Sequence, residues 1–208
     1  MAGGLGTRLS PVIKDIPKPM APILGKPFLE HQINMLKLKG FDNFVFCLGY
    51  LSKIIEDYFK DGEKFGVKIK YSYENKPLFS AGALKNAERL LEDNFVLING
   101  DNYVDLSYKE LLSNHKENEA MITLASKDFE ENLRSCHTFL AKDKEITKYF
   151  ATSEITKGNI AGLGIFAINK KLLHNLAHGI PLSLEKDLIQ NHVEKGEVFC
   201  YKENCYFI

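Results

Sequence analysis

The sequence has no excess of charge of either sign. Its 208 residues include 27 Lys plus Arg and 27 Asp plus Glu, so no basic field favours nucleic acid and no acidic tail is indicated. It also lacks a signal-peptide pattern and any apolar run long enough to cross a bilayer. These absences predict a cytoplasmic protein that has a small-molecule partner and binds neither nucleic acid nor a membrane.

No cysteine stands in a C-x-x-C pair. The four cysteines are widely spaced and lie mostly inside apolar runs such as "FVFCLGY". This placement favours buried, reduced thiols over disulfides or a zinc site. The residues are Cys47, Cys136, Cys200 and Cys205.

Apolar runs of strand length alternate with amphipathic segments of helix length. The alternation predicts an α/β protein with a mostly parallel sheet and helices on both faces. We expect strands at 43–50, 67–73, 95–100 and 120–126, and helices at 26–40, 51–60, 81–93 and 108–116.

The pattern changes after about residue 136. Here we expect a hairpin that turns at Asp143-Lys144, a strand at 159–168, and helices at 169–178 and 181–196. Because the chain has no repeat, linker or low-complexity run, we predict one domain over 1–208 with a β-rich second half.

The first ten residues, "MAGGLGTRLS", combine three glycines with Thr7 and Arg8, a composition suited to wrapping backbone around a phosphate. A dinucleotide fingerprint would need a further glycine where Leu9 stands, and no Lys-Ser or Lys-Thr closes a Walker loop. Ten residues after Arg8, Lys18 is held between two prolines. Arg offers a fork to phosphate oxygens and Lys a point charge, so the pair predicts a triphosphate site.

Asp101 is a candidate ligand-binding residue from its position alone. It follows "FVLING", the end of a predicted buried strand. Open α/β sheets keep their ligands at the carboxyl ends of their strands.

Residues 2–33, which contain GGLGTRL, PKPM and GKP in order, resemble the signature of the sugar-1-phosphate nucleotidylyltransferases. Later landmarks extend the resemblance over nearly the whole chain. They are "YENKPLFSAGAL", "LINGDNYVD", "AGLGIF" and "SLEKDL". The resemblance implies a Rossmann-like, three-layer α/β/α nucleotide-diphospho-sugar transferase fold, with a nucleotide-binding half over 1–126 and a sugar-binding half over 127–208.

The resemblance also implies residue roles. The triphosphate is held by the glycine-rich loop, Lys18 reaches the reacting phosphates, and Asp101 binds Mg²⁺, so that Arg8, Lys18 and Asp101 are the catalytic residues. Glu185 and Gly162 are the expected sugar-binding residues. The expected nucleotide-binding residues are Gly3, Gly4, Gly6, Thr7, Glu74, Phe79 and Gly82.

Three departures from the family pattern affect substrate recognition. Phe79 replaces a glycine that lets the backbone approach the base, and Ile160 stands where an Asn commonly precedes Ala161-Gly162. The segment "FATSEITKGN" also lacks the Glu-Lys pair that touches the sugar in relatives.

The implied reaction needs no general base. The attacking oxygen of a sugar 1-phosphate is already ionised near neutral pH, because the second pKa of a phosphate monoester is about 6. Alignment and charge neutralisation are needed instead. We therefore assign no catalytic role to histidine, and expect His31 and His115 on helix surfaces.

The resemblance further implies a strand before Met1 and, after Ile208, an Asp-Ile-Gly-Thr-Pro run with a second metal ligand. On this interpretation the chain is truncated at both ends, and we expect little transferase activity from it.

Three functions remain open at this point. The first is synthesis of a nucleotide sugar for surface polysaccharide such as capsule or lipopolysaccharide, with most similarity to the D-glycero-D-manno-heptose 1-phosphate guanylyltransferases. The second is an inactive nucleotide-binding homologue, and the third a cytidylyltransferase for a phosphorylated alcohol, against which "SAGAL" is the sugar-type form. The partners implied are a nucleoside triphosphate and a sugar 1-phosphate, and a homo-oligomer is compatible with the sequence.

Overall fold

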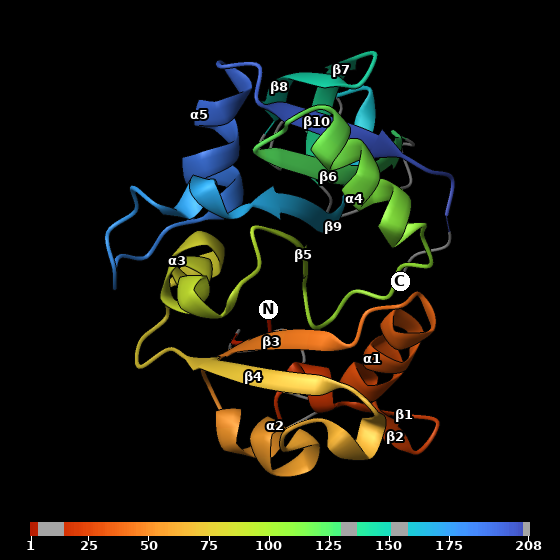
Figure 1. The fold of residues 1–208 in the computed structure, drawn as a ribbon, viewed down its shortest axis with the longest axis vertical. Helices are drawn as coiled ribbons and strands as arrows, with labels where there is room; N and C mark the ends of the chain where they lie inside the picture. The colour runs from red at the N-terminus through yellow and green to blue at the C-terminus, as the bar shows by residue number, and fades with distance from the viewer. Residues whose placement is uncertain (4–14, 130–136, 151–157, 206–208) are drawn as a thin grey trace. The chain divides into compact units, whose positions relative to one another are not determined.

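The computed structural model describes residues 1–3, 15–129, 137–150 and 158–205. These residues group into two compact units, each described here by itself (Figure 1). Unit 1 comprises Met1–Leu91, Asn99–Tyr103 and Leu176–Pro181. Unit 2 comprises Glu92–Ile98, Val104–Asn175 and Leu182–Ile208.

Unit 1 contains a two-stranded parallel sheet, a short hairpin and three α-helices, joined by 3₁₀ turns. In chain order its elements are η1 (Lys18–Met20), β1 (Pro22–Ile23), β2 (Lys26–Pro27), α1 (Phe28–Leu38), β3 (Asn43–Leu48), α2 (Ser52–Phe59), η2 (Glu63–Phe65), β4 (Lys68–Tyr73), α3 (Phe79–Ala87) and η3 (Glu88–Leu90).

Strand β3 is covered on both faces, as the apolar run that forms it predicts. It pairs in parallel with β4, from Asn43 opposite Lys68 to Leu48 opposite Tyr73. Side chains alternate across a strand, so Phe46 faces the cluster that includes α1 and α2, whereas Cys47 packs with alanines of α3. Unit 1 therefore has helices on both sides of its sheet.

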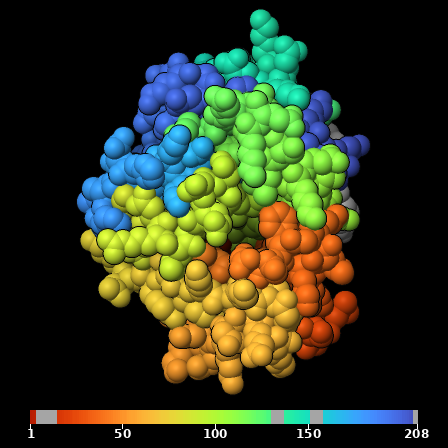
Figure 2. All heavy atoms as spheres, in the orientation of Figure 1, coloured from red at the N-terminus to blue at the C-terminus, as the bar shows by residue number. Residues whose placement is uncertain are grey.

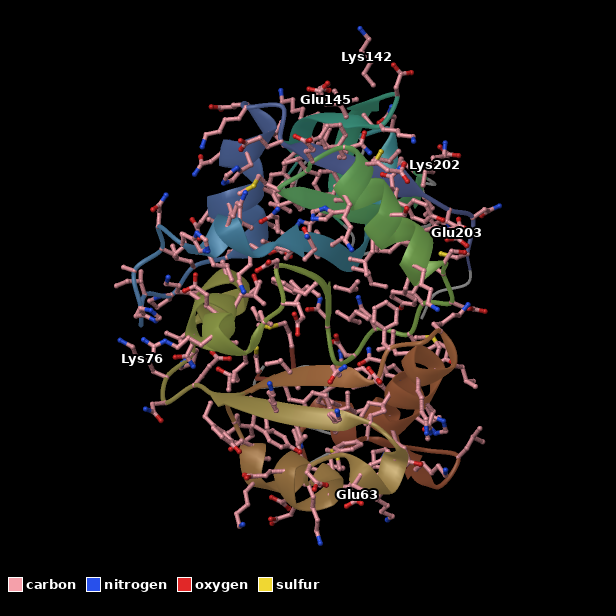
Figure 3. The ribbon with its side chains drawn as sticks, in the orientation of Figure 1. Glu63, Lys76, Lys142, Glu145, Lys202 and Glu203 are labelled. Atoms are coloured by element: carbon pink, nitrogen blue, oxygen red, sulfur yellow. The ribbon has the colours of Figure 1, made fainter. Side chains whose placement is uncertain are left out.

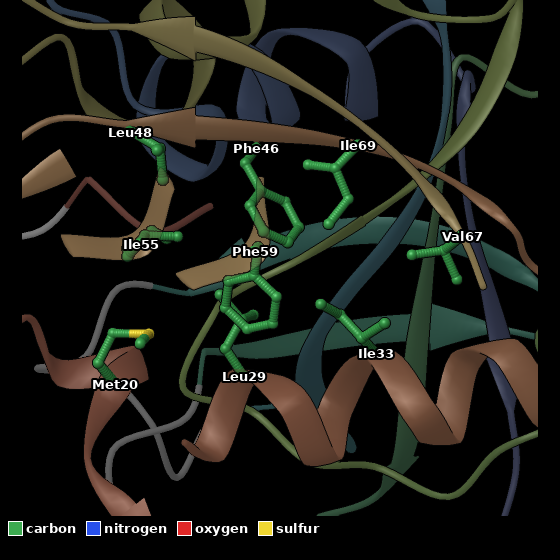
Figure 4. Close-up of a cluster of buried hydrophobic side chains, with 10 residues drawn as sticks. Met20, Leu29, Ile33, Phe46, Leu48, Ile55, Phe59, Val67 and Ile69 are labelled. Carbon is green, nitrogen blue, oxygen red and sulfur yellow. The ribbon is translucent and has the colours of Figure 1, made fainter. Parts of the chain in front are cut away.

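The larger apolar cluster of unit 1 lies between the sheet and helices α1 and α2 (Figure 4). The Phe46 and Phe59 rings meet edge to face, with centroids 5.7 Å apart. Leu29 and Ile33, one turn apart on α1, project toward them. This packing fixes α1 on the sheet.

Unit 2 is built around a six-stranded sheet of order β5-β9-β6-β10-β8-β7. Strand β7, at the end of this order, also pairs with β9. Its elements are β5 (Asn94–Ile98), α4 (Tyr108–Glu117), β6 (Ile122–Asp128), β7 (Thr138–Lys142), β8 (Glu145–Phe150), β9 (Ile160–Asn169), η5 (Lys170–Leu173), the π-helix η6 (Leu184–Ile189), α5 (Gln190–Val193) and β10 (Val198–Lys202).

Parallel pairing is less common than the sequence pattern predicts. Strands β3 and β4 are parallel, as are β10 and β6, whereas the remaining pairings of the six-stranded sheet are antiparallel. The physical reason is the β-rich second half of the chain. Its hairpin and the long strand β9 join the same sheet as β5 and β6 without helical crossovers.

The predicted hairpin is confirmed, with strands β7 and β8 on either side of Asp143-Lys144. Asp143 adopts a left-handed φ of 55°, which short polar residues tolerate in turns. Lys142 and Glu145 flank the turn and point away from the sheet (Figure 3).

The helix predicted at 169–178 is wrong. Only the 3₁₀ turn η5 forms, where the Asn169 side chain accepts a hydrogen bond from the Lys171 backbone N–H, and where Leu172 and Leu173 are both buried. The His174 N–H donates to the Lys171 carbonyl, three residues back, so the segment closes as a 3₁₀ turn. The helix predicted at 181–196 begins later, at Leu184, because Ser183 caps it. Strand β10 was not predicted.

His115 is also not a surface residue. Helix α4 has one exposed side, part of which is visible in green in Figure 2, and Lys109, Glu110, Lys116 and Glu117 are exposed, whereas Leu111 and His115, one turn apart, are buried. The His115 Nδ1 atom lies 3.0 Å from the Thr123 hydroxyl of β6. His31, in contrast, is partly exposed, with Nε2 2.8 Å from the Ile23 carbonyl oxygen.

Three cysteines lie in the described ranges, and all are free thiols. Cys47 and Cys200 are buried, which raises the pKa of both thiols, whereas Cys205 is partly exposed. Cys136 lies outside the described residues. None of the helices that the structure describes is long and apolar enough to cross a membrane.

Candidate active site

Lys18 begins the 3₁₀ turn η1, which the flanking prolines make rigid. Pro17 has φ −69° and ψ 146°, an extended conformation, and the Met20 N–H donates to the Pro17 carbonyl over 2.8 Å. Pro19 and Met20 are buried, whereas the Lys18 side chain is 38% exposed. Because proline fixes φ, the backbone on both sides of Lys18 is rigid, and the side chain extends from a fixed Cα position.

Asp101 lies in a turn just after β5, as predicted from the end of the apolar run. The Asn102 N–H donates to the Asn99 carbonyl over 3.1 Å, which closes the turn around Gly100 and Asp101. The Lys18 ammonium donates a hydrogen bond to Asp101 Oδ2. The structure therefore brings together two of the three predicted catalytic residues.

Two glycines allow the backbone segments of this site to approach closely. A Cβ on Gly3 would lie 2.6 Å from Glu74 Oε1, closer than real Cβ contacts. A Cβ on Gly100 would lie 3.0 Å from the Met1 carbonyl oxygen and 3.1 Å from Pro19 Cγ. Gly3 and Glu74, both predicted to bind nucleotide, are thus neighbours.

Glu74 is half-buried at the end of β4. Burial raises the pKa of its carboxyl group, and the Leu78 backbone N–H, which donates to Oε2 over 2.8 Å, opposes that shift. Leu78 immediately precedes helix α3, so Glu74 satisfies one of the backbone donors left free at a helix start.

Phe79 opens helix α3 with a left-handed φ of 56°, and its side chain is 65% exposed. A bulky residue rarely adopts such a φ, whereas glycine does so readily. This is the position where the family resemblance places a glycine. Gly82, one turn further along α3, is buried.

In unit 2, Gly162 lies on β9 next to the start of β7. Its N–H donates to the His137 carbonyl over 2.9 Å, and an added Cβ would lie 3.0 Å from the Phe139 ring. Glu185 lies in η6 and accepts a hydrogen bond from the Ser183 hydroxyl over 3.1 Å.

Tyr149 and His137 join this part of unit 2, and the sequence analysis did not identify either. The Tyr149 hydroxyl lies 3.0 Å from His137 Nδ1. Burial, followed by the charge of Glu185, raises the pKa of Tyr149. No spacing in the sequence signals the pair, because a bulge in the β7–β8 pairing between Leu140 and Ala141 sets which residues face each other.

Four predicted site residues lie outside the described residues, so their positions carry no structural statement. They are Gly4, Gly6, Thr7 and Arg8.

The Asp101 carboxylate fits a magnesium ion that arrives with phosphate ligands. The part of the chain that the structure describes contains no group of three or more His, Cys, Asp or Glu side chains suited to a metal. Mg²⁺ is commonly bound through one or two carboxylates plus substrate phosphates and water. An oxygen donor 36% exposed beside a lysine meets that requirement, whereas a preformed protein cage is not present in the described ranges.

Comparison with known proteins shows the family of the chain. The model of the nucleotidyl transferase family matches residues 1–201. The chain belongs to this family. It is therefore a nucleotidyltransferase, and its fold is the nucleotide-diphospho-sugar transferase fold of its structural neighbours.

Among transferases of known function, two similar sequences carry the same description. The D-glycero-alpha-D-manno-heptose 1-phosphate guanylyltransferase of Campylobacter jejuni is 36% identical over 208 residues, covering 100% of this chain and 91% of the relative. The enzyme of that name from Aneurinibacillus thermoaerophilus is 33% identical over 210 residues, covering 100% and 90%. The crystal structure of HddC from Yersinia pseudotuberculosis complexed with GMP-PN superposes with a TM-score of 0.82 at 29% identity, covering 100% of this chain and 90% of that one.

Proposed function

We propose that this nucleotidyltransferase makes an NDP-sugar from a nucleoside triphosphate and a sugar 1-phosphate, and that its substrates are GTP and a heptose 1-phosphate. The observation that carries the proposal is the pairing of Lys18 with Asp101 in a chain that the family model matches over residues 1–201. The guanylyltransferase relatives, at 36% and 33% identity, support guanine as the base and heptose as the sugar.

In the proposed reaction, an oxygen of the sugar 1-phosphate attacks the α-phosphorus of GTP. A new phosphorus–oxygen bond forms, the bond from the α-phosphorus to the bridging oxygen breaks, and pyrophosphate leaves with that electron pair. The attacking oxygen is ionised near neutral pH because a phosphate monoester has a second pKa of about 6. The chain's residues therefore align and neutralise anions, and abstract no proton.

Lys18 supplies a fixed positive charge to the reacting phosphates. Its ammonium donates to Asp101, and the Pro17-Lys18-Pro19 backbone fixes the point from which the side chain extends toward the proposed phosphates. Charge held ready for the transition state is more effective than charge that must be reorganised. Arg8, Thr7 and the loop glycines are proposed to hold the rest of the triphosphate.

Asp101 would hold Mg²⁺, which when bound supplies further neutralisation of phosphate charge. Glu74, Phe79 and Gly82 are proposed to lie along the nucleotide, beside Gly3. A carboxylate at Glu74 accepts hydrogen bonds from sugar hydroxyl or base N–H groups.

The sugar is proposed to bind at the polar group formed by Gly162, Glu185, Tyr149 and His137. The Tyr149 hydroxyl is bonded to His137 and is close enough to Glu185 to be affected by its charge, so these three polar side chains lie in one part of unit 2. Such groups bind the hydroxyls of a carbohydrate. The product would serve as a sugar donor for surface polysaccharide, and the reaction would take place in the cytoplasm, where nucleoside triphosphates are available.

The test is pyrophosphate release under Mg²⁺. Each of GTP, CTP, UTP and dTTP is paired with heptose, mannose or glucose 1-phosphate. GTP with D-glycero-D-manno-heptose 1-phosphate should give the highest kcat/KM. A preference for CTP with a phosphorylated alcohol, or no release with any pair, would contradict the proposal, whereas turnover of GTP would overturn the expectation from the resemblance that this chain has little transferase activity.

Site variants sharpen the same assay. Lys18→Ala and Asp101→Asn should each abolish most of the activity, whereas Lys53→Ala should not. Lys53 is a suitable control because it is a lysine of unit 1 paired with an aspartate, Asp57, on the surface of α2. Equal losses in all three variants would indicate a general effect of charge rather than a site.

A further inference from the structure

Gln32 is a buried polar residue that the proposed chemistry does not use. It lies on α1 and is 4% exposed. Its side-chain Nε2 donates to the Asn99 carbonyl over 2.9 Å and also to the Asn102 carbonyl. A polar group is buried at a cost unless it is hydrogen-bonded, so these two bonds are the reason an amide is stable here.

The two carbonyls that Gln32 binds lie on either side of Asp101. Asn99 and Asn102 are the first and last residues of the turn, joined to each other by the Asn102 N–H bond to the Asn99 carbonyl. One amide group therefore clamps both ends of the turn whose third residue is Asp101. The Gly100 N–H is bound in turn by the Met1 carbonyl over 2.7 Å.

Helix α1 contacts the same segment at a second point. The Phe28 and Tyr103 rings meet edge to face, with centroids 6.4 Å apart and planes at 73°. Phe28 and Gln32 are four residues apart and so lie on one face of the helix. This face of α1 is a platform for the Asn99–Tyr103 segment.

The segment that carries Lys18 is also hydrogen-bonded to helix α1. The Phe28 backbone N–H, at the start of α1, donates to the Ala21 carbonyl over 2.9 Å, immediately after the turn that carries Lys18. Helix α1 is thus hydrogen-bonded to Ala21, the residue after the turn that carries Lys18, and to Asn99 and Asn102, which flank the turn position of Asp101.

We infer that Gln32 is a positioning residue for Asp101, which holds the turn so that the carboxylate meets the metal and phosphates where Lys18 is fixed. The inference rests on the proposed function, because it gives Asp101 the role of a metal ligand. Gln32 touches no substrate and acts only through the turn.

The test compares Gln32→Met, which keeps the volume but cannot donate, with the unaltered protein. Two measurements are made: the affinity for Mn²⁺ in the presence of GTP, from the electron paramagnetic resonance of free Mn²⁺, and the steady-state kinetics of pyrophosphate release. We expect Mn²⁺ affinity and kcat each to fall about 10–100-fold, as for other residues that orient a metal ligand, with KM for the sugar 1-phosphate within about twofold.

Tyr58→Phe is the matched control. Its hydroxyl donates to Glu30 Oε2 on the same helix over 2.6 Å, so the variant loses a comparable bond to α1 without touching the turn. Mn²⁺ affinity and kcat should stay within about twofold, because changes at sites that share no partner act nearly independently. If Gln32→Met does not fold, Gln32→Leu takes its place, since its side chain is also of similar volume and carries no donor.

The possible outcomes separate this inference from the proposed function. Unchanged Mn²⁺ affinity and kcat in the Gln32 variants would overturn the positioning role. If the unaltered chain turns over no substrate pair, the proposed function fails, and the Mn²⁺ measurement still decides: Gln32→Met must weaken binding as Asp101→Asn does. If Asp101→Asn binds Mn²⁺ normally, Asp101 is not a metal ligand and the inference is overturned.

Discussion

The Lys18 ammonium is paired with the Asp101 carboxylate, although 83 positions separate the two residues in the chain. Each side chain is more than a third exposed, at 38% and 36%. A pair so open to solvent contributes little to stability, typically about 0–1 kcal/mol. The pairing of Asp101 with a lysine held between two prolines is accordingly better explained by chemistry than by stability.

Replacing Lys18 should therefore affect catalysis far more than folding. Lys18→Met should lower kcat about 10²–10³-fold, since one charge-stabilising group is lost. The free energy of unfolding in urea should change by less than about 1 kcal/mol. A loss of stability that accounts for the loss of activity would show that Lys18 is structural. Lys53→Met, on the surface of α2, controls for removal of a paired lysine.

Phe79→Gly should stabilise the protein, because it removes a bulky residue from a φ of 56°. The left-handed conformation costs a non-glycine residue about 1 kcal/mol, part of which is offset by the greater freedom of glycine in the unfolded chain. Phe79→Ala keeps the unfavourable φ and should give no gain. Urea unfolding of both variants measures the difference in stability. Equal stabilities would show that the backbone at Phe79 is not strained.

The same variant tests the base site. If the exposed Phe79 ring obstructs the nucleotide, Phe79→Gly should tighten binding of GTP in a calorimetric titration, and if the ring stacks on the base, binding should weaken. We expect the first result. An unchanged affinity for all of GTP, CTP, UTP and dTTP would place Phe79 away from the base.

His115 should make the protein sensitive to acid. Burial, with a smaller effect of Lys116, lowers the pKa of His115 to about 4 from an ordinary value of 6.5. The folded state thus favours the neutral ring, so its contribution to stability is complete above pH 6.5 and is lost as the pH falls from 6.5 toward 4. The full loss is about 3 kcal/mol for this shift.

Urea unfolding between pH 7.5 and 4 measures this loss. His115→Gln, which does not titrate, should flatten the curve in that window relative to the unaltered protein. An equally steep fall in the variant would assign the acid sensitivity to other groups.

Tyr149→Phe should raise KM for the sugar 1-phosphate about tenfold and leave KM for GTP unchanged, because one hydrogen bond is worth about 1 kcal/mol or slightly more. The variant removes the hydroxyl that contacts His137 Nδ1. Tyr201→Phe is the control, since it removes a tyrosine hydroxyl of unit 2 that donates to Glu110 over 2.9 Å. Equal effects of the two changes on KM would contradict a sugar site at Tyr149.

Much of the local structure follows from the sequence. Strands β3, β4, β5, β6 and β9 lie where apolar runs predicted them, and α1, α2 and α4 where amphipathic periodicity did. Lys18, between two prolines, and Asp101, after a buried strand, could also be predicted from the sequence as site residues, because proline rigidity and strand ends are local properties. The order of motifs identified the family before any fold was known.

The tertiary structure decided the rest, because the deciding contacts join distant segments. Local periodicity placed His115 on a helix but not against Thr123, and it predicted a helix at 169–178 where the chain forms only the 3₁₀ turn η5. Antiparallel pairings outnumber parallel ones because β9 and the β7–β8 hairpin join the same sheet as β5 and β6, and no short segment of sequence shows which strands become neighbours. The sequence by itself determined which residues hold charge and which backbone is rigid. Only folding brought Lys18 to Asp101 and the Gln32 amide to the turn that carries Asp101, since hydrogen bonds across 67 to 83 positions depend on how the chain packs.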